Sequence, residues 1–337
     1  MSDLALRLLL GFLPVVLFFL ALMSLDSFKL VRLRAALGTI AVGAAAAALA
    51  MFLNAFLMDA LGLSTWAFSR YGAPLVEETL KALPVLFLIR SQRVGFLVDS
   101  AIYGFAAGAG FALAENVYYL ASFPETGPIV WVIRGFGTAI LHGGTMALFG
   151  ILSKSLTDRR PSLGAAVFLP GWLAAVAIHA AFNHFLVSPV ASTLAILVVL
   201  PLTVVAVFRR SERSLRDWLG VGFDADAELL ELIDSERLPD SRVGSYLQSL
   251  RTSFRGEVVA DMLCYLRLHT ELTLRAKGEL MMREAGFKSE IEPDVREKLQ
   301  EMKYLEKTIG PTGRLAMLPF LHGSDKTLWQ LGMLRKD

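Results

Sequence analysis

Seven apolar stretches in the first 208 residues constrain the fold of this chain more than any other feature. At about 1.5 Å of rise per helical residue, each is long enough to cross roughly 30 Å of hydrocarbon. The stretches are Leu4–Leu25, Ala35–Leu57, Ala73–Ile89, Ser100–Leu120, Ile129–Leu152, Leu163–Val187 and Val190–Phe208. Because a backbone inside lipid must satisfy its own hydrogen bonds, the pattern predicts an all-α, polytopic transmembrane helix bundle of about seven spans.

The distribution of charge divides the chain into two parts. Residues 1–208 contain 12 Lys or Arg and 9 Asp or Glu, whereas residues 209–337 contain 21 and 22. We therefore expect a seven-span transmembrane domain over 1–208 and a soluble, cytoplasmic helical domain over 209–337. Apolar residues of the second part recur mostly at spacings of three and four, which favours helices. That part has no block of basic residues, so we expect no nucleic-acid partner.

Basic residues gather in alternate loops between the predicted spans. They follow the first, third, fifth and seventh spans, as Lys29, Arg32, Arg34, Arg90, Arg93, Lys154, Arg159, Arg160, Arg209, Arg210 and Arg213. The positive-inside rule then predicts an N-terminus outside the membrane and a cytoplasmic C-terminal domain. The single cysteine, Cys264, forms no internal disulfide, which suits a reducing cytoplasm.

Carboxylates interrupt two of the apolar stretches. The third stretch carries Glu77, Glu78 and Lys81, and spacings of three and four place Lys81 beside both carboxylates on one helical face. The fourth stretch carries Glu115 and Asn116 at a position that no loop explains. Because a charged group in hydrocarbon is costly, such residues usually pair with each other or serve a function.

Two histidines interrupt the fifth and sixth stretches. His142 is followed by two glycines, and His179 shares a helical face with Asn183, which could orient an imidazole or polarise a carbonyl. Gly104 and Gly108 form a small-xxx-small pair that we expect to let another helix approach closely. Counting about 1.5 Å per residue from the cytoplasmic ends places the glutamates and histidines at similar depths, about 18–24 Å. We therefore expect them to meet in the outer half of the membrane.

Two kinds of hydrolytic site fit these residue types. Histidines with glutamates can bind a zinc ion that keeps one position for water. The candidate zinc ligands are His142, His179, Glu115 and Glu78. The metal-free alternative uses one carboxylate, for which we favour Glu77, as general base on water, while His142, His179 and Asn183 orient the water and stabilise the oxyanion. The sequence contains no H-E-x-x-H motif, so either site is assembled between helices. Both alternatives predict peptide hydrolysis inside the membrane.

The motifs resemble those of the PrsW family of intramembrane proteases, which is related to the CAAX-processing and bacteriocin-processing proteases. They are Glu77-Glu78-x-x-Lys81, Phe111-x-x-x-Glu115-Asn116, His142 and His179-x-x-x-Asn183. The resemblance covers about residues 71–186. It implies a protease of the bacterial cytoplasmic membrane that cleaves membrane-anchored proteins, such as an anti-sigma factor at a first site. CAAX-type relatives have an arginine one position after Lys81 and a histidine in place of Glu115, which argues against prenyl-protein processing here.

The candidate catalytic residues are therefore Glu77, Glu78, Glu115, His142, His179 and Asn183, with Lys81 and Asn116 in support. The main alternative is a proton- or cation-coupled transporter, because acidic and histidine residues in a bundle can relay protons or bind cations. Transporters often contain two repeated halves, and the sequence shows no such repeat. A non-catalytic scaffold acting through residues 209–337 is a third alternative. The sequence leaves homo-oligomerisation open.

Overall fold

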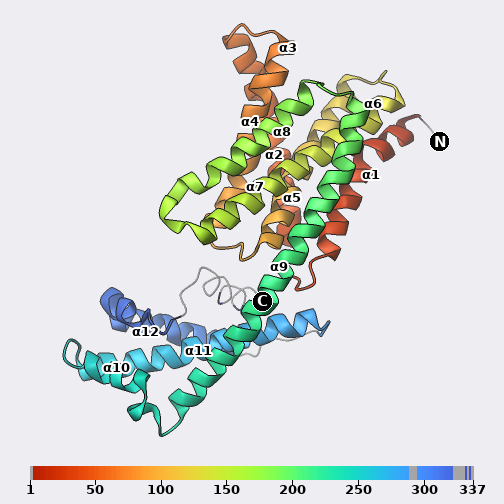
Figure 1. Ribbon diagram of the computed structural model, residues 1–337. Coiled ribbons are helices and arrows are strands. Elements are labelled where there is room, and N and C mark those ends of the chain that lie inside the picture. The colour runs from red at the N-terminus through yellow and green to blue at the C-terminus, as the bar shows by residue number, and fades with distance from the viewer. Residues whose placement is uncertain (1–2, 288–293, 322–330, 332–333, 335–337) are drawn as a thin grey trace. The chain divides into compact units, whose positions relative to one another are not determined.

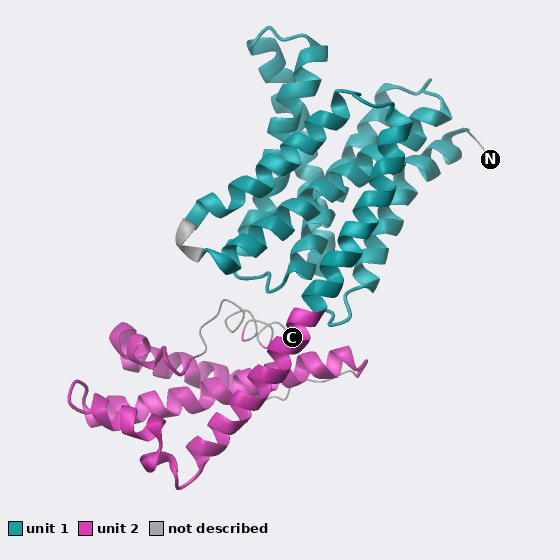
Figure 2. Ribbon diagram, viewed as in Figure 1, with its two compact units in different colours: residues 1–212 teal, residues 213–337 magenta. Residues whose placement is uncertain are grey.

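The chain folds into helices that form two compact units, Met1–Glu212 and Arg213–Asp337 (Figures 1 and 2). The computed structural model describes residues 3–287, 294–321, 331 and 334. Among these residues there are helices and no strands, so the predicted all-α class is confirmed. The assignment of residues 1–208 and 209–337 to a transmembrane and a cytoplasmic domain stays a prediction.

The first unit, which we call the membrane unit, is a bundle of long helices (Figure 1). They are α1 (Asp3–Ser24), α2 (Leu33–Ala60), α3 (Thr65–Ala67), α4 (Ala73–Arg90), α5 (Leu97–Ser122), α6 (Pro128–Val132), α7 (Ile140–Arg159), α8 (Leu169–Asn183) and the first part of α9 (Pro189–Asp234). The π-helical segments η1 (Phe68–Gly72) and η2 (Ile133–Ala139) lead directly into α4 and α7, and the 3-10 segment η3 (Pro161–Phe168) leads into α8.

Six helical segments of the described chain are long and apolar enough to cross a membrane. They are Asp3–Ser24, Leu33–Ala60, Leu97–Ser122, Pro128–Arg159, Gly164–Asn183 and Pro189–Asp234. The remaining predicted span forms the 18-residue helix α4, which carries Glu77, Glu78, Lys81 and Arg90. Helix α4 packs against α2, α5, α7 and α8, and the first three of its charged side chains are buried there. The bundle therefore shields the charges that lower the apolarity of this helix.

Helices α5 and α7 form the centre of the membrane unit, where they lie side by side (Figure 1). Phe105 of α5 and Met146 of α7 are fully buried in the same core cluster. By contrast, α1, α2 and α9 leave large apolar side chains exposed, among them Leu17, Phe52 and Leu202. An apolar outer surface on a helix bundle is what contact with lipid requires. The polar residues of α4, α5 and α7 thus lie at the middle of the bundle.

Two glycines set the close approach of α5 to α7. A Cβ atom at Gly104 would lie 2.2 Å from the carbonyl oxygen of Met146, and one at Gly108 would lie 2.0 Å from the carbonyl oxygen of His142. The small-xxx-small pair in the sequence thus packs against the backbone of the helix that carries His142. Any side chain at Gly108 would push the two helices apart beside that histidine.

Replacing Gly108 with alanine is expected to lower the free energy of unfolding of the membrane unit by about 1–3 kcal/mol, the usual cost of overpacking. Gly38→Ala is the matched control, because nothing lies within 4 Å of a Cβ atom there. Because Gly38 lies in helix α2, Gly38→Ala is expected to leave the free energy of unfolding unchanged or to raise it by up to about 1 kcal/mol. Denaturant titration of both variants in detergent measures the difference, and equal stabilities would contradict the packing account.

The second unit, which we call the C-terminal unit, contains the end of α9 with η4 (Leu238–Asp240), α10 (Arg242–Leu250), α11 (Gly256–Glu284) and α12 (Asp294–Met317). Its core is built around α11, whose Met262, Leu266 and Leu272 are fully buried. Gly286 follows α11 with a φ of +82°, a conformation that glycine adopts without a steric penalty, and so allows the chain to leave the helix. The last predicted span and the first helix of this unit are one continuous helix, α9.

Candidate active site

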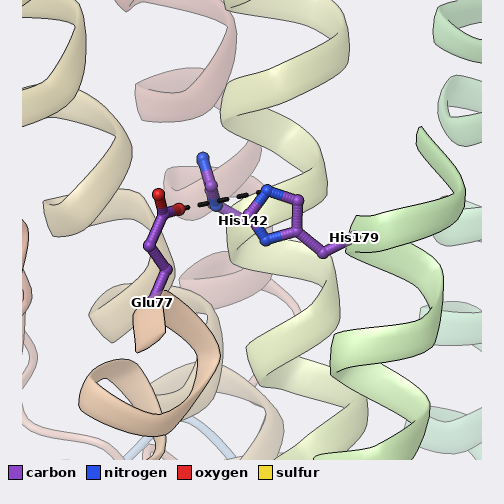
Figure 3. A group of neighbouring side chains, drawn as sticks. All are labelled: Glu77, His142 and His179. Atoms are coloured by element: carbon purple, nitrogen blue, oxygen red, sulfur yellow. Dashed lines mark ion pairs between the residues drawn. The ribbon is translucent and has the colours of Figure 1, made fainter. Parts of the chain in front are cut away.

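Three side chains from three helices meet inside the membrane unit: Glu77 of α4, His142 of α7 and His179 of α8 (Figure 3). All three are buried, and one possible ligand atom from each lies within 4.8 Å of the other two. His179 Nε2 lies 3.9 Å from Glu77 Oε2, and the imidazole rings meet edge to face with centroids 4.9 Å apart. The protein thus has a possible Glu/His/His metal site inside the bundle.

Glu78 contacts this cluster through His179 and is fully buried. Its Oε1 accepts hydrogen bonds from Lys81 Nζ at 2.5 Å and from His179 Nδ1 at 2.7 Å, and its Oε2 accepts one from Thr145 Oγ1 at 3.1 Å. A carboxylate that accepts the Nδ1 proton of a histidine fixes the orientation of the ring and leaves Nε2 as an acceptor. Glu78 therefore orients His179, and the carboxylate of the possible metal site is Glu77, where Glu78 was predicted.

Lys81 also contacts His142, across 61 residues of sequence. Its Nζ lies 2.7 Å from His142 Nδ1, while His142 Nε2 lies 3.2 Å from Glu115 Oε2. Because an ammonium group donates and does not accept, Nδ1 must be the acceptor in this contact. A neutral His142 then carries its proton on Nε2 and donates it to Glu115. Both nitrogens of this histidine are engaged.

Glu115 and Asn116 belong to a polar layer between α5, η2 and α1. Glu115 Oε2 lies 3.1 Å from Nη2 of Arg134, whose guanidinium also stacks 3.5 Å from the centre of the Tyr119 ring. Asn116 Oδ1 accepts from Arg134 Nε at 2.9 Å, and its Nδ2 donates to the carbonyl of Gly11 at 2.7 Å. Asn116 therefore ties α1 to the bundle and holds the arginine that pairs with Glu115.

Asn183 lies on the same helix as His179, but its hydrogen bond goes to another partner. Its Nδ2 donates to the carbonyl oxygen of Ser69 in η1 at 2.8 Å, and the contact that orients His179 comes from Glu78 instead. The π-helical turn before α4 brings this carbonyl to the end of α8, a contact that no local sequence pattern predicts. Asn183 still lines the cavity that holds the cluster.

That cavity has a volume of about 880 Å³. Glu77, Glu115, His142 and His179 share its wall with apolar side chains of α2, α5 and α8, such as Met51, Phe111 and Phe182. An apolar pocket with a few convergent polar groups is the usual form of a binding or reaction site. The cluster is therefore both buried within the bundle and accessible to a ligand in the cavity.

Two residues outside the predicted site contact the central carboxylates. Thr145 donates to Glu78, and Asn54 of α2 donates from Nδ2 to Glu77 Oε1 at 3.2 Å. The signal for Asn54 was present, because a lone carboxamide inside an apolar span needs a partner. The π-helical segment η2, which carries the buried Arg134, has no comparable sequence signal, although such segments are frequent at functional sites.

Residues 31–208 match the family model described as PrsW family intramembrane metalloprotease. The chain belongs to the PrsW family. Neither a curated protein nor a solved structure matches it significantly. The matched region includes every residue of the Glu77, Glu78, Glu115, His142 and His179 constellation, so this PrsW protein is an intramembrane protease. The resemblance expected from the four sequence motifs is confirmed.

The PrsW description names a metalloprotease, and the distances alone would allow Glu77, His142 and His179 to bind a metal ion. The proton positions fit less well. A hydrolytic zinc site commonly uses three protein ligands, and a neutral histidine that binds through Nε2 carries its proton on Nδ1. His142 Nδ1 instead faces the Lys81 ammonium at 2.7 Å. The side chains of Glu77 and His179 are therefore suited to bind a zinc ion, and that of His142 is not.

Proposed function

We propose that this PrsW protein is an endopeptidase that cleaves membrane-anchored protein substrates, with Glu77 as the general base that activates water. The observation that carries the proposal is the convergence of Glu77 and His179 at one point of a buried cavity. A carboxylate at such a point has few other uses, because hydrocarbon penalises it. A Glu77→Gln variant that folds and cleaves as fast as the wild type would contradict the proposal.

The distance between Glu77 and His179 is suitable for a reacting water that lies between them. Their Oε2 and Nε2 atoms are 3.9 Å apart, too far for a direct hydrogen bond, and a water between them could bond to both. With the Nδ1 proton donated to Glu78, His179 Nε2 is an acceptor. Such a water would donate one proton to each side chain and direct a lone pair at the substrate carbonyl carbon.

The hydrolysis then balances with the residues of the chain alone. Glu77 takes a proton from the water, the hydroxide oxygen bonds to the carbonyl carbon, and negative charge develops on the carbonyl oxygen. The C–N bond breaks as its electron pair goes to nitrogen, which receives the proton from Glu77. We assign His142 Nε2–H as the donor to the developing charge, a contact for which it must give up its hydrogen bond to Glu115. Asn183, which lines the same cavity, stays a candidate for a second donor.

The orientation in the membrane that we propose is inferred from the positive charges in the loops. The positive-inside rule places the C-terminal unit in the cytoplasm of a bacterium and the N-terminus outside its cytoplasmic membrane. The cavity then lies in the outer half of the bilayer. The family resemblance favours a single-span regulatory protein, such as an anti-sigma factor, as substrate.

Because Lys81 Nζ contacts His142 Nδ1, we expect the protein to bind little zinc. Protein purified without added metal is expected to hold far less than one zinc per chain, and a strong chelator is expected to leave its proteolysis unchanged. Mass spectrometry of the wild type beside His142→Ala and His179→Ala measures the content, with His184→Ala as control because its Nδ1 contacts only its own helix, at the Ala180 carbonyl. Stoichiometric zinc that both site variants lose and the control retains would establish a metal site and overturn the assignment of His142.

A further inference from the structure

Asn54 is the polar residue of α2 that faces the reaction centre. Helix α2 is apolar along most of its length, yet this carboxamide lies in the wall of the cavity, and its Nδ2 donates to Glu77 Oε1 at 3.2 Å. No other hydrogen bond to Glu77 is formed by the described side chains. The bond occupies Oε1, so Oε2 is the oxygen that remains for His179 and a water. Asn54 thus determines which oxygen of the base is presented.

The other end of the carboxamide lacks a partner. Asn54 Oδ1 is buried and accepts no hydrogen bond from any residue that the structure describes. A buried acceptor without a donor is unfavourable and is rare in folded proteins, so it usually marks a place where a ligand or water completes the contact. Asn54 thus contacts the base Glu77 through Nδ2, while its Oδ1 can accept a hydrogen bond from a ligand in the cavity.

A substrate backbone can supply that donor. A peptide bond inside a helix must be freed from the helix before it can be attacked, and N–H groups freed within hydrocarbon need new acceptors. Two other carboxylates near the cluster already have partners of their own. Glu78 accepts from Lys81, His179 and Thr145, while Glu115 accepts from His142 and pairs with Arg134.

We propose that Asn54 positions Glu77 through Nδ2 and binds one backbone N–H of the unwound substrate through Oδ1. The inference rests on the proposed protease function and deepens it, since it assigns a substrate contact to α2. It gives α2 two roles, in presenting the base and in aligning the peptide. A purely structural Asn54 would only tie α2 to α4.

The test uses the full-length protein in proteoliposomes with quenched-fluorescent peptides that each carry one apolar span. The peptide that the wild type cleaves fastest is then made as a series in which single backbone amides are replaced by esters, which removes one N–H at a time. In the wild type, one position of the series is expected to lower kcat/KM about tenfold, the size of one hydrogen bond. In Asn54→Leu the same replacement is expected to have no effect.

The variants separate the two ends of the carboxamide. Asn54→Leu is expected to lower kcat by about 10–100-fold, as misplacement of a reacting group does, with the midpoint of thermal unfolding unchanged. Asn54→Asp loses the donor and keeps the acceptor, so it is expected to lower kcat and to retain the ester effect. Thr39→Val is the control on the same helix, because the one side-chain hydrogen bond of Thr39 among the described residues goes to the carbonyl of Ala35.

Four outcomes would overturn the inference. Full activity of Asn54→Leu would remove both roles, and a loss of activity that parallels a lowered unfolding midpoint would leave Asn54 purely structural. An ester effect that is the same in Asn54→Leu and the wild type would remove the substrate contact. If the wild type cleaves no peptide of the pool although Asn54 variants and wild type fold alike, the proposed protease function fails, and the inference fails with it.

Discussion

Glu77→Gln is expected to slow proteolysis by about 10²–10⁴-fold, the usual contribution of a general base. Glutamine keeps the shape of the side chain and can still accept from Asn54 Nδ2, but it cannot take a proton from water. The fold should survive, because the central ion pair of Lys81 with Glu78 is untouched. Initial rates of cleavage of a single-span peptide in proteoliposomes measure the effect.

Two comparisons make the Glu77 result specific. Glu125→Gln, in an exposed loop, is expected to leave the rate unchanged. Glu77→Asp keeps the carboxylate but withdraws it from Asn54 and His179, so its rate should fall between those of the wild type and Glu77→Gln. A Glu77→Gln variant with the wild-type rate would show that another group activates the water.

Removal of the Lys81 charge is expected to have the largest effect on stability. Lys81 and Glu78 are both fully buried, and Lys81 Nζ contacts Glu78 Oε1 at 2.5 Å and His142 Nδ1 at 2.7 Å. Lys81→Met leaves a buried carboxylate without its cation, which typically costs about 3–5 kcal/mol. It also releases His142 from the contact that sets its tautomer, so proteolysis should be lost. Denaturant titration of the protein in detergent gives the change in stability.

A double-mutant cycle separates the charge effect from simple packing. Glu78→Gln combined with Lys81→Met removes both charges, so the double variant should be more stable than the sum of the two single losses predicts. It should still be inactive, because His179 loses the carboxylate that orients it. Additive losses, or a Lys81→Met variant as stable as the wild type, would show that the pair is weakly coupled.

The helices of the membrane unit could be predicted from the sequence because membrane insertion depends on length and apolarity, which are local properties. The six predicted stretches with full apolar character and the charged stretch that forms α4 all appear as helical segments, and the last of them continues past Phe208 to Asp234. The pairing of Glu78 with Lys81 was also predictable, since a spacing of three sets it within one helix. The close approach beside Gly108 followed from the same kind of local pattern.

The contacts between helices could not be predicted in the same way. The helical register places Lys81 beside Glu78, but the contact of Lys81 with His142 depends on how α4 and α7 pack. The spacing places Asn183 on the helical face of His179, but its hydrogen bond to the Ser69 carbonyl depends on how η1 packs against α8. Asn54 was visible as a polar residue in an apolar stretch, but its partner lies on another helix. Tertiary packing determines each of these three contacts.

The proposed function requires that peptide bonds inside the membrane are cleaved only when Glu77 is present. The most direct measurement is mass spectrometry of new protein termini in membranes of cells that contain either the wild type or Glu77→Gln at equal amounts. We expect termini within apolar spans that the wild type generates and the variant does not. Identical termini in both, together with proton or cation flux through the purified protein in liposomes, would contradict the account and establish a transporter.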